Sequence, residues 1–214
     1  MTKRVVFILL FAVTSFSNAQ ALKNIGFKAG GMVSQFKYEY NIDGYKYNSD
    51  PYSVIRVSAG VYGEFFNLPV FSVIGEINYI EKGAHREIDV TDISNPDGLG
   101  KLTDVDAYLK YINISILSKV RLDGIYFSPY LLLGPKVDFE VGRDVHSALT
   151  PLYNGVQKIR FGFKAGVGTE LKLWGINFIS EVLFDKDLGY LYDSGGLQIA
   201  NYGIDFRTGA FINL

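Results

Sequence analysis

The sequence contains no cysteine, and it has only two histidines and one tryptophan among its 214 residues. Without cysteine there is no disulfide framework, which a secreted domain of this size does not need. Two histidines without cysteine also offer no transition-metal cluster of the usual kind. Beyond the N-terminus the sequence lacks any run of 18 or more apolar residues, so a transmembrane helix is not expected there.

The sequence also lacks an excess of charge of either sign. Its 21 basic and 22 acidic residues nearly balance. Nucleic-acid-binding proteins usually carry a basic surplus that engages phosphates, and this chain has none. We therefore expect no nucleic-acid partner.

The first 19 residues have the three parts of a secretory signal peptide. A basic pair precedes an apolar stretch of about nine residues, which is too short to cross a bilayer as a helix. Ser17 and Ala19 stand where signal peptidase requires small residues. We expect cleavage before Gln20, which leaves residues 20–214 as one domain. The alternative is an N-terminal anchor or a buried strand.

Apolar and polar residues alternate along most of the remaining chain, as in a β-strand with two different faces. In one stretch, Ile159, Phe161 and Phe163 alternate with Arg160 and Lys164. A helix would need apolar residues three and four positions apart. Eight segments share the alternation and are predicted strands: 25–38, 53–66, 70–82, 108–121, 125–140, 158–173, 176–186 and 201–214.

The connections between these segments alternate strictly between short and long. Three are minimal, at 67–69, 122–124 and 174–175, and they contain turn-forming residues that favour hairpins. Four are long and polar: 39–52, 83–107, 141–157 and 187–200. An up-and-down barrel with this order has all its long loops at one rim, which is typical of outer-membrane barrels. The sequence therefore predicts an all-β fold, an eight-stranded antiparallel up-and-down transmembrane β-barrel.

The sequence alone does not reveal which strand faces point inward. The polar faces combine charged residues with glycines, which suits the crowded lumen of an eight-stranded barrel. Charges enclosed there must pair or stay hydrated. We predict a lumenal network of nine charged residues: Arg56, Glu64, Glu76, Arg160, Lys164, Glu170, Glu181, Asp205 and Arg207. The alternatives are solvated charges on a soluble sandwich and an ion-conducting pore lined by these residues.

Aromatic residues gather near the ends of the predicted strands, where membrane-interface girdles belong. Tyrosines flank the long loops, and phenylalanines with the single tryptophan flank the short turns. The predicted girdle members include Tyr38, Tyr40 and Tyr52 at the loop side and Phe66, Phe71 and Trp174 at the turn side.

Two stretches resemble the PorT-like outer-membrane β-barrel proteins of Bacteroidetes. Residues 108–120 are similar to a strand of that family, although Asn113-Ile114-Ser115 replaces its Glu-Ile-Pro core. Residues 127–139 look like its following strand, with Pro129, Gly134 and Pro135 in place. The resemblance implies a fold and an outer-membrane location. One namesake of the family is tied to protein secretion across the outer membrane.

Candidate catalytic residues are few. His85 and His146 both lie in predicted long loops, and His146-Ser147 with Asp144 is the nearest approach to a Ser/His/Asp set. The loop 83–107 is acidic, but its spacing does not match an EF-hand, so we expect a solvated loop in place of a calcium site. We predict no catalytic residues, no cofactor and no metal.

The expected function is non-enzymatic, with long extracellular loops that serve partner binding, adhesion or envelope integrity. The expected partners are outer-membrane lipid, the barrel-assembly machinery during insertion and a protein at the loops. Three alternatives stay open: an accessory role in protein secretion, a lipid-A-modifying barrel enzyme and a soluble periplasmic ligand-binding barrel.

Overall fold

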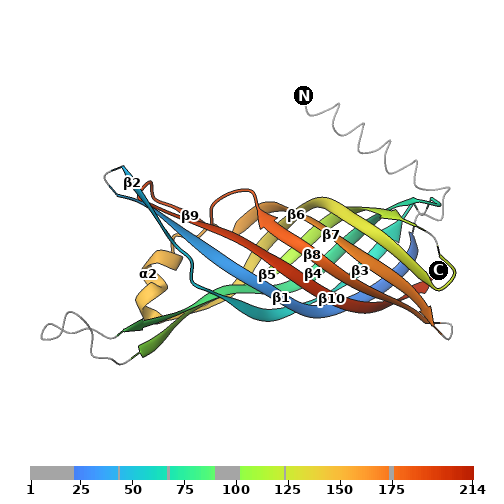
Figure 1. Cartoon of the computed structure of the whole chain (residues 1–214), viewed down its shortest axis with the longest axis horizontal. Helices are drawn as coiled ribbons and strands as arrows, with labels where there is room; N and C mark the ends of the chain where they lie inside the picture. The colour runs from blue at the N-terminus through green and yellow to red at the C-terminus, as the bar shows by residue number, and fades with distance from the viewer. Residues whose placement is uncertain (1–21, 43, 67, 90–101, 123, 174–175) are drawn as a thin grey trace, which may run out of the picture.

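The computed structural model describes residues 22–42, 44–66, 68–89, 102–122, 124–173 and 176–214. One antiparallel sheet closes on itself because its first long strand, β1 (Leu22–Ile42), pairs with its last, β10 (Leu197–Asn213). Figure 1 shows the resulting tilted barrel seen from the side. The signal peptide predicted for residues 1–19 lies outside the described residues and stays a prediction.

Eight strands form the ring, and each is hydrogen-bonded to its neighbours in the sequence. Between β1 and β10 lie β3 (Tyr52–Phe65), β4 (Phe71–Asp89), β5 (Leu102–Arg121), β6 (Phe127–Val145), β7 (Ile159–Leu173) and β8 (Ile176–Asp187). Every predicted segment corresponds to one of these strands. The predicted eight-stranded antiparallel up-and-down barrel is confirmed.

The outer face of the ring is apolar and the inner face is polar. Phe27, Ile116 and Phe161 are 60%, 58% and 67% exposed, whereas Lys28, Ser115 and Arg160, their neighbours in the sequence, are buried. A soluble barrel has the opposite arrangement, with its apolar face inside. The exposed apolar wall therefore suits contact with lipid, and it rules out the solvated sandwich and the water-soluble ligand-binding barrel.

The strands continue beyond the predicted limits on the long-loop side. The pairing of β4 with β5 extends to Asp89 opposite Leu102, so much of the predicted loop 83–107 is a two-stranded ribbon. The outer face of this ribbon carries exposed residues such as Glu87 and Asp104, while Ala84, Val105 and Ala107 on its inner face are buried. Backbone groups still gain hydrogen bonds by continuing the ladder.

Two further strands lie above the same rim. β2 (Tyr45–Ser49) pairs with β1, and β9 (Tyr192–Asp193) pairs with β10. Gly44, with a φ of +83°, makes the turn between β1 and β2, a conformation that residues with a side chain rarely adopt. These strands occupy the predicted loops 39–52 and 187–200.

The predicted loop 141–157 contains two short helical turns, η2 (Ser147–Leu149) and α2 (Thr150–Tyr153). Figure 1 shows α2 at the end of the barrel that also carries β2 and β9, while the C-terminus lies at the other end. No helix in the described ranges is long and apolar enough to span a membrane.

We predict that Ile116→Arg destabilises the protein by about 2–4 kcal/mol, because it places a charge on the lipid-facing wall. Tyr126→Arg is the matched control, since Tyr126 is 72% exposed beside a short turn. Urea unfolding in lipid vesicles measures both, with heat-dependent gel mobility as the sign of the closed barrel. An equally small cost for both variants would mean that the wall faces water.

Candidate functional site

The lumen holds three tiers of paired charges, and the tier nearest the short turns contains one lysine between two glutamates. The Lys119 Nζ lies 3.1 Å from a carboxylate oxygen of Glu64 and also contacts Glu170. Asn24 and Ser72 donate hydrogen bonds to Glu64 at 2.9 and 2.5 Å. These residues come from five different strands, so this turn-side tier forms only when the barrel closes.

The central tier joins two carboxylates to two cations. The Lys28 Nζ lies 2.6 Å from Glu76 and 2.8 Å from Glu181. The Arg207 guanidinium contacts the same two carboxylates at 3.0 and 2.7 Å. The Tyr130 hydroxyl donates a further hydrogen bond to Glu181 at 2.8 Å. Each carboxylate therefore meets both cations.

The loop-side tier is built around three aspartates, Asp138, Asp185 and Asp187. Their oxygens lie close enough together to hold a metal ion. Two ammonium groups stand among them instead, because Lys136 contacts all three aspartates at 2.6–2.7 Å and Lys82 contacts Asp138 and Asp185 at 2.9 and 2.7 Å. The lysines neutralise these carboxylates, so the donor set does not fit a metal.

The buried lumenal charges nearly cancel. Among the described residues, seven buried cations meet eight buried anions: Lys28, Lys82, Lys119, Lys136, Arg160, Lys164 and Arg207 against Glu64, Glu76, Asp138, Glu170, Glu181, Asp185, Asp187 and Asp205. Arg121, whose side chain is 13% exposed, adds a positive charge near Glu64 and Glu170. Unpaired charges in such an interior would carry a desolvation penalty of several kcal/mol each.

Glycines on the inner face of β7 make room for the long side chains. A Cβ on Gly162 would lie 2.5 Å from the Lys136 side chain, and one on Gly168 would lie 2.5 Å from the Tyr130 ring. Even alanine would therefore displace a member of the network at either position. The crowding agrees with the narrow interior of an eight-stranded barrel.

Eight of the nine residues predicted for the lumenal network lie buried in it: Glu64, Glu76, Arg160, Lys164, Glu170, Glu181, Asp205 and Arg207. Arg160 lies 2.8 Å from Asp187, and Lys164 lies 4.0 Å from Asp205. Arg56, the ninth predicted residue, lies outside the tiers. Its guanidinium stacks over the Tyr108 ring, 3.6 Å from the centroid, and is partly exposed.

The prediction missed seven lumenal charges: Lys28, Lys82, Lys119, Lys136, Asp138, Asp185 and Asp187. Six of them occupy polar positions of the predicted strands, so their alternation with apolar residues was the available signal, whereas Asp187 lies in the predicted connection 187–200. The ion-pair partners of these charges could not be predicted from the sequence, because they depend on the register of strands far apart in the sequence.

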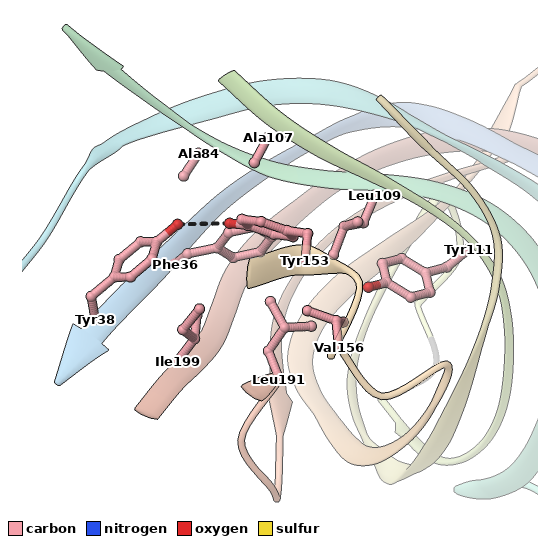
Figure 2. Packing of buried hydrophobic residues seen from close by; sticks show 10 residues of the cluster. All are labelled: Phe36, Tyr38, Ala84, Ala107, Leu109, Tyr111, Tyr153, Val156, Leu191 and Ile199. Carbon is pink, nitrogen blue, oxygen red and sulfur yellow. Dashed lines mark hydrogen bonds between the residues drawn. The ribbon is translucent and has the colours of Figure 1, made fainter. Parts of the chain in front are cut away.

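A hydrophobic plug closes the lumen above the loop-side tier. Figure 2 shows Tyr153 of α2 inserted between the strands, with its hydroxyl 2.6 Å from that of Tyr38. Phe36, Leu109 and Leu191 are fully buried around it. Tyr38, predicted for a membrane girdle, is thus part of the plug. Tyr38 occupies an inward-facing position of β1, so its ring lies inside the mouth of the barrel and not at the membrane interface.

His85 lies on the ribbon of β4 and β5, opposite Asp106. Its Nδ1 is 2.6 Å from the Asp106 carboxylate, and this hydrogen bond raises the pKa of His85 above its ordinary value. Burial acts to raise the pKa of Asp106, but the hydrogen bonds from His85 and Tyr108 and the nearby positive charges together lower it. Glu87 and Asp104 lie near His85 and are exposed. Exposed acidic groups often gather without an ion, and we assign no metal here.

His146 does not form a catalytic set with its neighbours. Its Nδ1 accepts a hydrogen bond from the backbone N–H of Ala148 at 3.3 Å and so caps η2. Among the described residues, no hydrogen bond joins it to Asp144 or to the Ser147 hydroxyl. The structure thus gives this histidine a local structural contact.

Comparisons with known proteins point to one envelope family. The family model described as "Outer membrane protein beta-barrel domain" matches residues 6–208. No curated protein matches the chain. Among solved structures, OprG from Pseudomonas aeruginosa is 12% identical, covers 91% of this chain and 98% of its own, and gives a TM-score of 0.49.

A second similar structure is Ail, the attachment invasion locus protein of Yersinia pestis, in complex with the heparin analogue sucrose octasulfate. It is 14% identical, covers 89% of this chain and 99% of its own, and gives a TM-score of 0.38. Neisserial surface protein A is 9% identical, with 88% and 96% covered and a TM-score of 0.43.

We predict that Arg207→Leu lowers the free energy of unfolding by about 3–5 kcal/mol, because it leaves Glu76 and Glu181 with a single buried cation between them. Arg56→Leu is the matched control and should cost less than about 1 kcal/mol, since its partner is a half-exposed ring. Urea unfolding in vesicles measures both. Similar costs would show that Arg207 contributes no more than a rim residue.

We predict that Asp106→Asn lowers the pKa of His85 toward its ordinary value of about 6.5. Because the folded-state pKa is raised, the His85–Asp106 pair stabilises the protein fully below pH 6.5 and loses this contribution as the pH rises through the folded-state pKa. NMR titration of the His85 ring measures the shift. An unchanged His85 titration in the variant would contradict the role of the hydrogen bond.

Proposed function

Because the chain belongs to the outer membrane protein beta-barrel domain family, we propose that it is a closed, non-conducting scaffold that binds a partner through its extracellular end. The family places the protein in the outer membrane. The observation that carries the proposal is the filling of the lumen by ion pairs and by the Tyr153 plug. The remaining accessible surface outside the lipid is at the two rims.

Conduction would require an ion to pass all three tiers. Each tier joins groups from opposite walls, as Lys28 of β1 does with Glu76 of β4 and Glu181 of β8. A passing ion would have to displace these contacts and then part Tyr153 from Tyr38. This supports a structural role for the lumen and leaves binding to the outer parts.

The extracellular end offers a surface suited to recognition. We call β2, the end of β1 and the start of β10 the outer flap. On one face of the flap, Tyr45 and Tyr47 are 82% and 65% exposed. On the other, a groove of about 120 Å³ is lined by charged and amide groups that include Glu39, Lys46 and Asn48. Exposed tyrosines beside adaptable polar groups are typical of protein recognition surfaces.

We predict that the double variant Tyr45→Ser, Tyr47→Ser loses most of the attachment that the protein confers on cells. The matched control is Ile125→Ser, Tyr126→Ser, whose side chains are 83% and 72% exposed at the opposite rim. Adherence and autoaggregation of cells displaying equal amounts of each protein measure the effect. Equal adherence of both variants would show that the outer flap is not the binding surface.

Planar-bilayer recording tests the other half of the proposal. The purified protein should give no discrete conductance steps, because the lumen is sealed by paired charges and by the plug. Reproducible single-channel steps whose conductance changes in Arg207→Leu or Tyr153→Ala samples would identify a lumenal pore and overturn the non-conducting scaffold.

The PorT-like resemblance supports a second candidate, an accessory role in protein secretion. The residues that carry it belong to the barrel wall: Gly134 packs where a Cβ would meet the Ile116 carbonyl oxygen, and Tyr130 binds Glu181. These residues therefore support a shared barrel architecture more than a shared activity.

An unchanged set of secreted proteins in cells without this chain would contradict the secretion role. An unchanged mass of lipid A in the same cells would contradict lipid-A modification. Insertion by the barrel-assembly machinery is part of either proposal.

A further inference from the structure

An apolar hollow lies at the mouth of the barrel, beside the plug. This mouth pocket has a volume of about 150 Å³ and lies between the inner faces of β1, β4 and β5 and the segment of η2 and α2. Its walls include Tyr38, Ala84, Ala107 and Leu149. It is separated from the charged tiers by the pair of hydroxyls of Tyr38 and Tyr153 (Figure 2).

The pocket exists because small residues stand where larger ones would fill the space. Ala84 and Ala107 are directly opposite each other in the ladder of β4 and β5, and both are buried. Figure 2 shows their methyl groups together on one side of the tyrosine pair. An apolar cavity of about 150 Å³ stays dry and accepts a molecule as large as benzene.

One cation lines this otherwise apolar pocket. Arg86 follows Ala84 on the same face of β4 and is exposed, opposite Val105 of β5. In the described part of the chain Arg86 forms no salt bridge, and its neighbours in the pocket carry no carboxylate. A guanidinium binds a carboxylate through two parallel hydrogen bonds, which makes it a specific partner for that group.

We propose that the mouth pocket binds a small monocarboxylate with a compact apolar body, of the size of benzoate. The carboxylate pairs with Arg86, and the apolar body lies between Ala84 and Ala107 on one side and Leu149 and Leu152 on the other. An apolar pocket beside one cation without a salt bridge favours monocarboxylates over neutral or doubly charged molecules. The site is distinct from the outer flap and does not depend on partner binding there.

The test uses the full folded protein in detergent and sodium benzoate as the probe. Isothermal titration and saturation-transfer NMR should show saturable binding at one site per chain. Benzyl alcohol, which has the same body without the charge, should bind about tenfold more weakly, the loss expected for one charged contact. Binding that never saturates, as in partition into the micelle, would overturn the proposal.

Three variants locate the site. Arg86→Gln should weaken benzoate binding about tenfold and leave benzyl alcohol unaffected. Ala107→Leu should abolish binding of both molecules by filling the pocket. Lys46→Gln, which removes the same charge from the outer flap, should change neither. Heat-dependent gel mobility confirms folding in each case, and Arg86→Gln keeps the test decisive if Ala107→Leu fails to fold. Unaltered benzoate affinity in Arg86→Gln would refute the assignment.

Discussion

Pairing of buried charges across a narrow lumen is the constraint on which the rest of this barrel depends. The apolar face of every strand contacts lipid, so the polar face must point into the interior of the barrel. An eight-stranded ring leaves no water-filled channel wide enough to solvate fifteen buried ionic side chains, so each must meet opposite charge. Lys28, Glu76, Glu181 and Arg207 meet this requirement from four strands at once.

The same constraint separates the wall from the parts that can recognise other molecules. A substitution in the tiers removes a partner from several charges, so the wall tolerates little change. Above the rim the backbone still forms ladders, but outward side chains such as Tyr45 and Tyr47 meet water. Tyr153 lies between the charged lumen and the extracellular end, and the mouth pocket lies on the extracellular side of it.

Alternation along the chain was sufficient to predict all eight strands, because lipid and lumen impose opposite polarity on successive residues. It also identified eight members of the network. Arg56 lies in the stretch between Ser53 and Ser58, where the pairing of β3 with β4 shifts register. Such an irregularity turns a side chain away from the face that its parity predicts. The ribbon of β4 and β5 was predicted as a loop because its outer face is acidic, although Ala84, Val105 and Ala107 on its inner face are buried.

The sequence by itself determined the eight strands of the ring, their order and the sorting of long and short connections, since these follow from local periodicity and turn chemistry. Tertiary structure decided which face is inside, because that depends on how the ring closes. It also decided which charges pair, since Lys136 meets Asp185 only through the registers of three strands. The placement of Tyr153 in the mouth was decided in the same way, because no local pattern marks a loop residue that packs against strands far away in the chain.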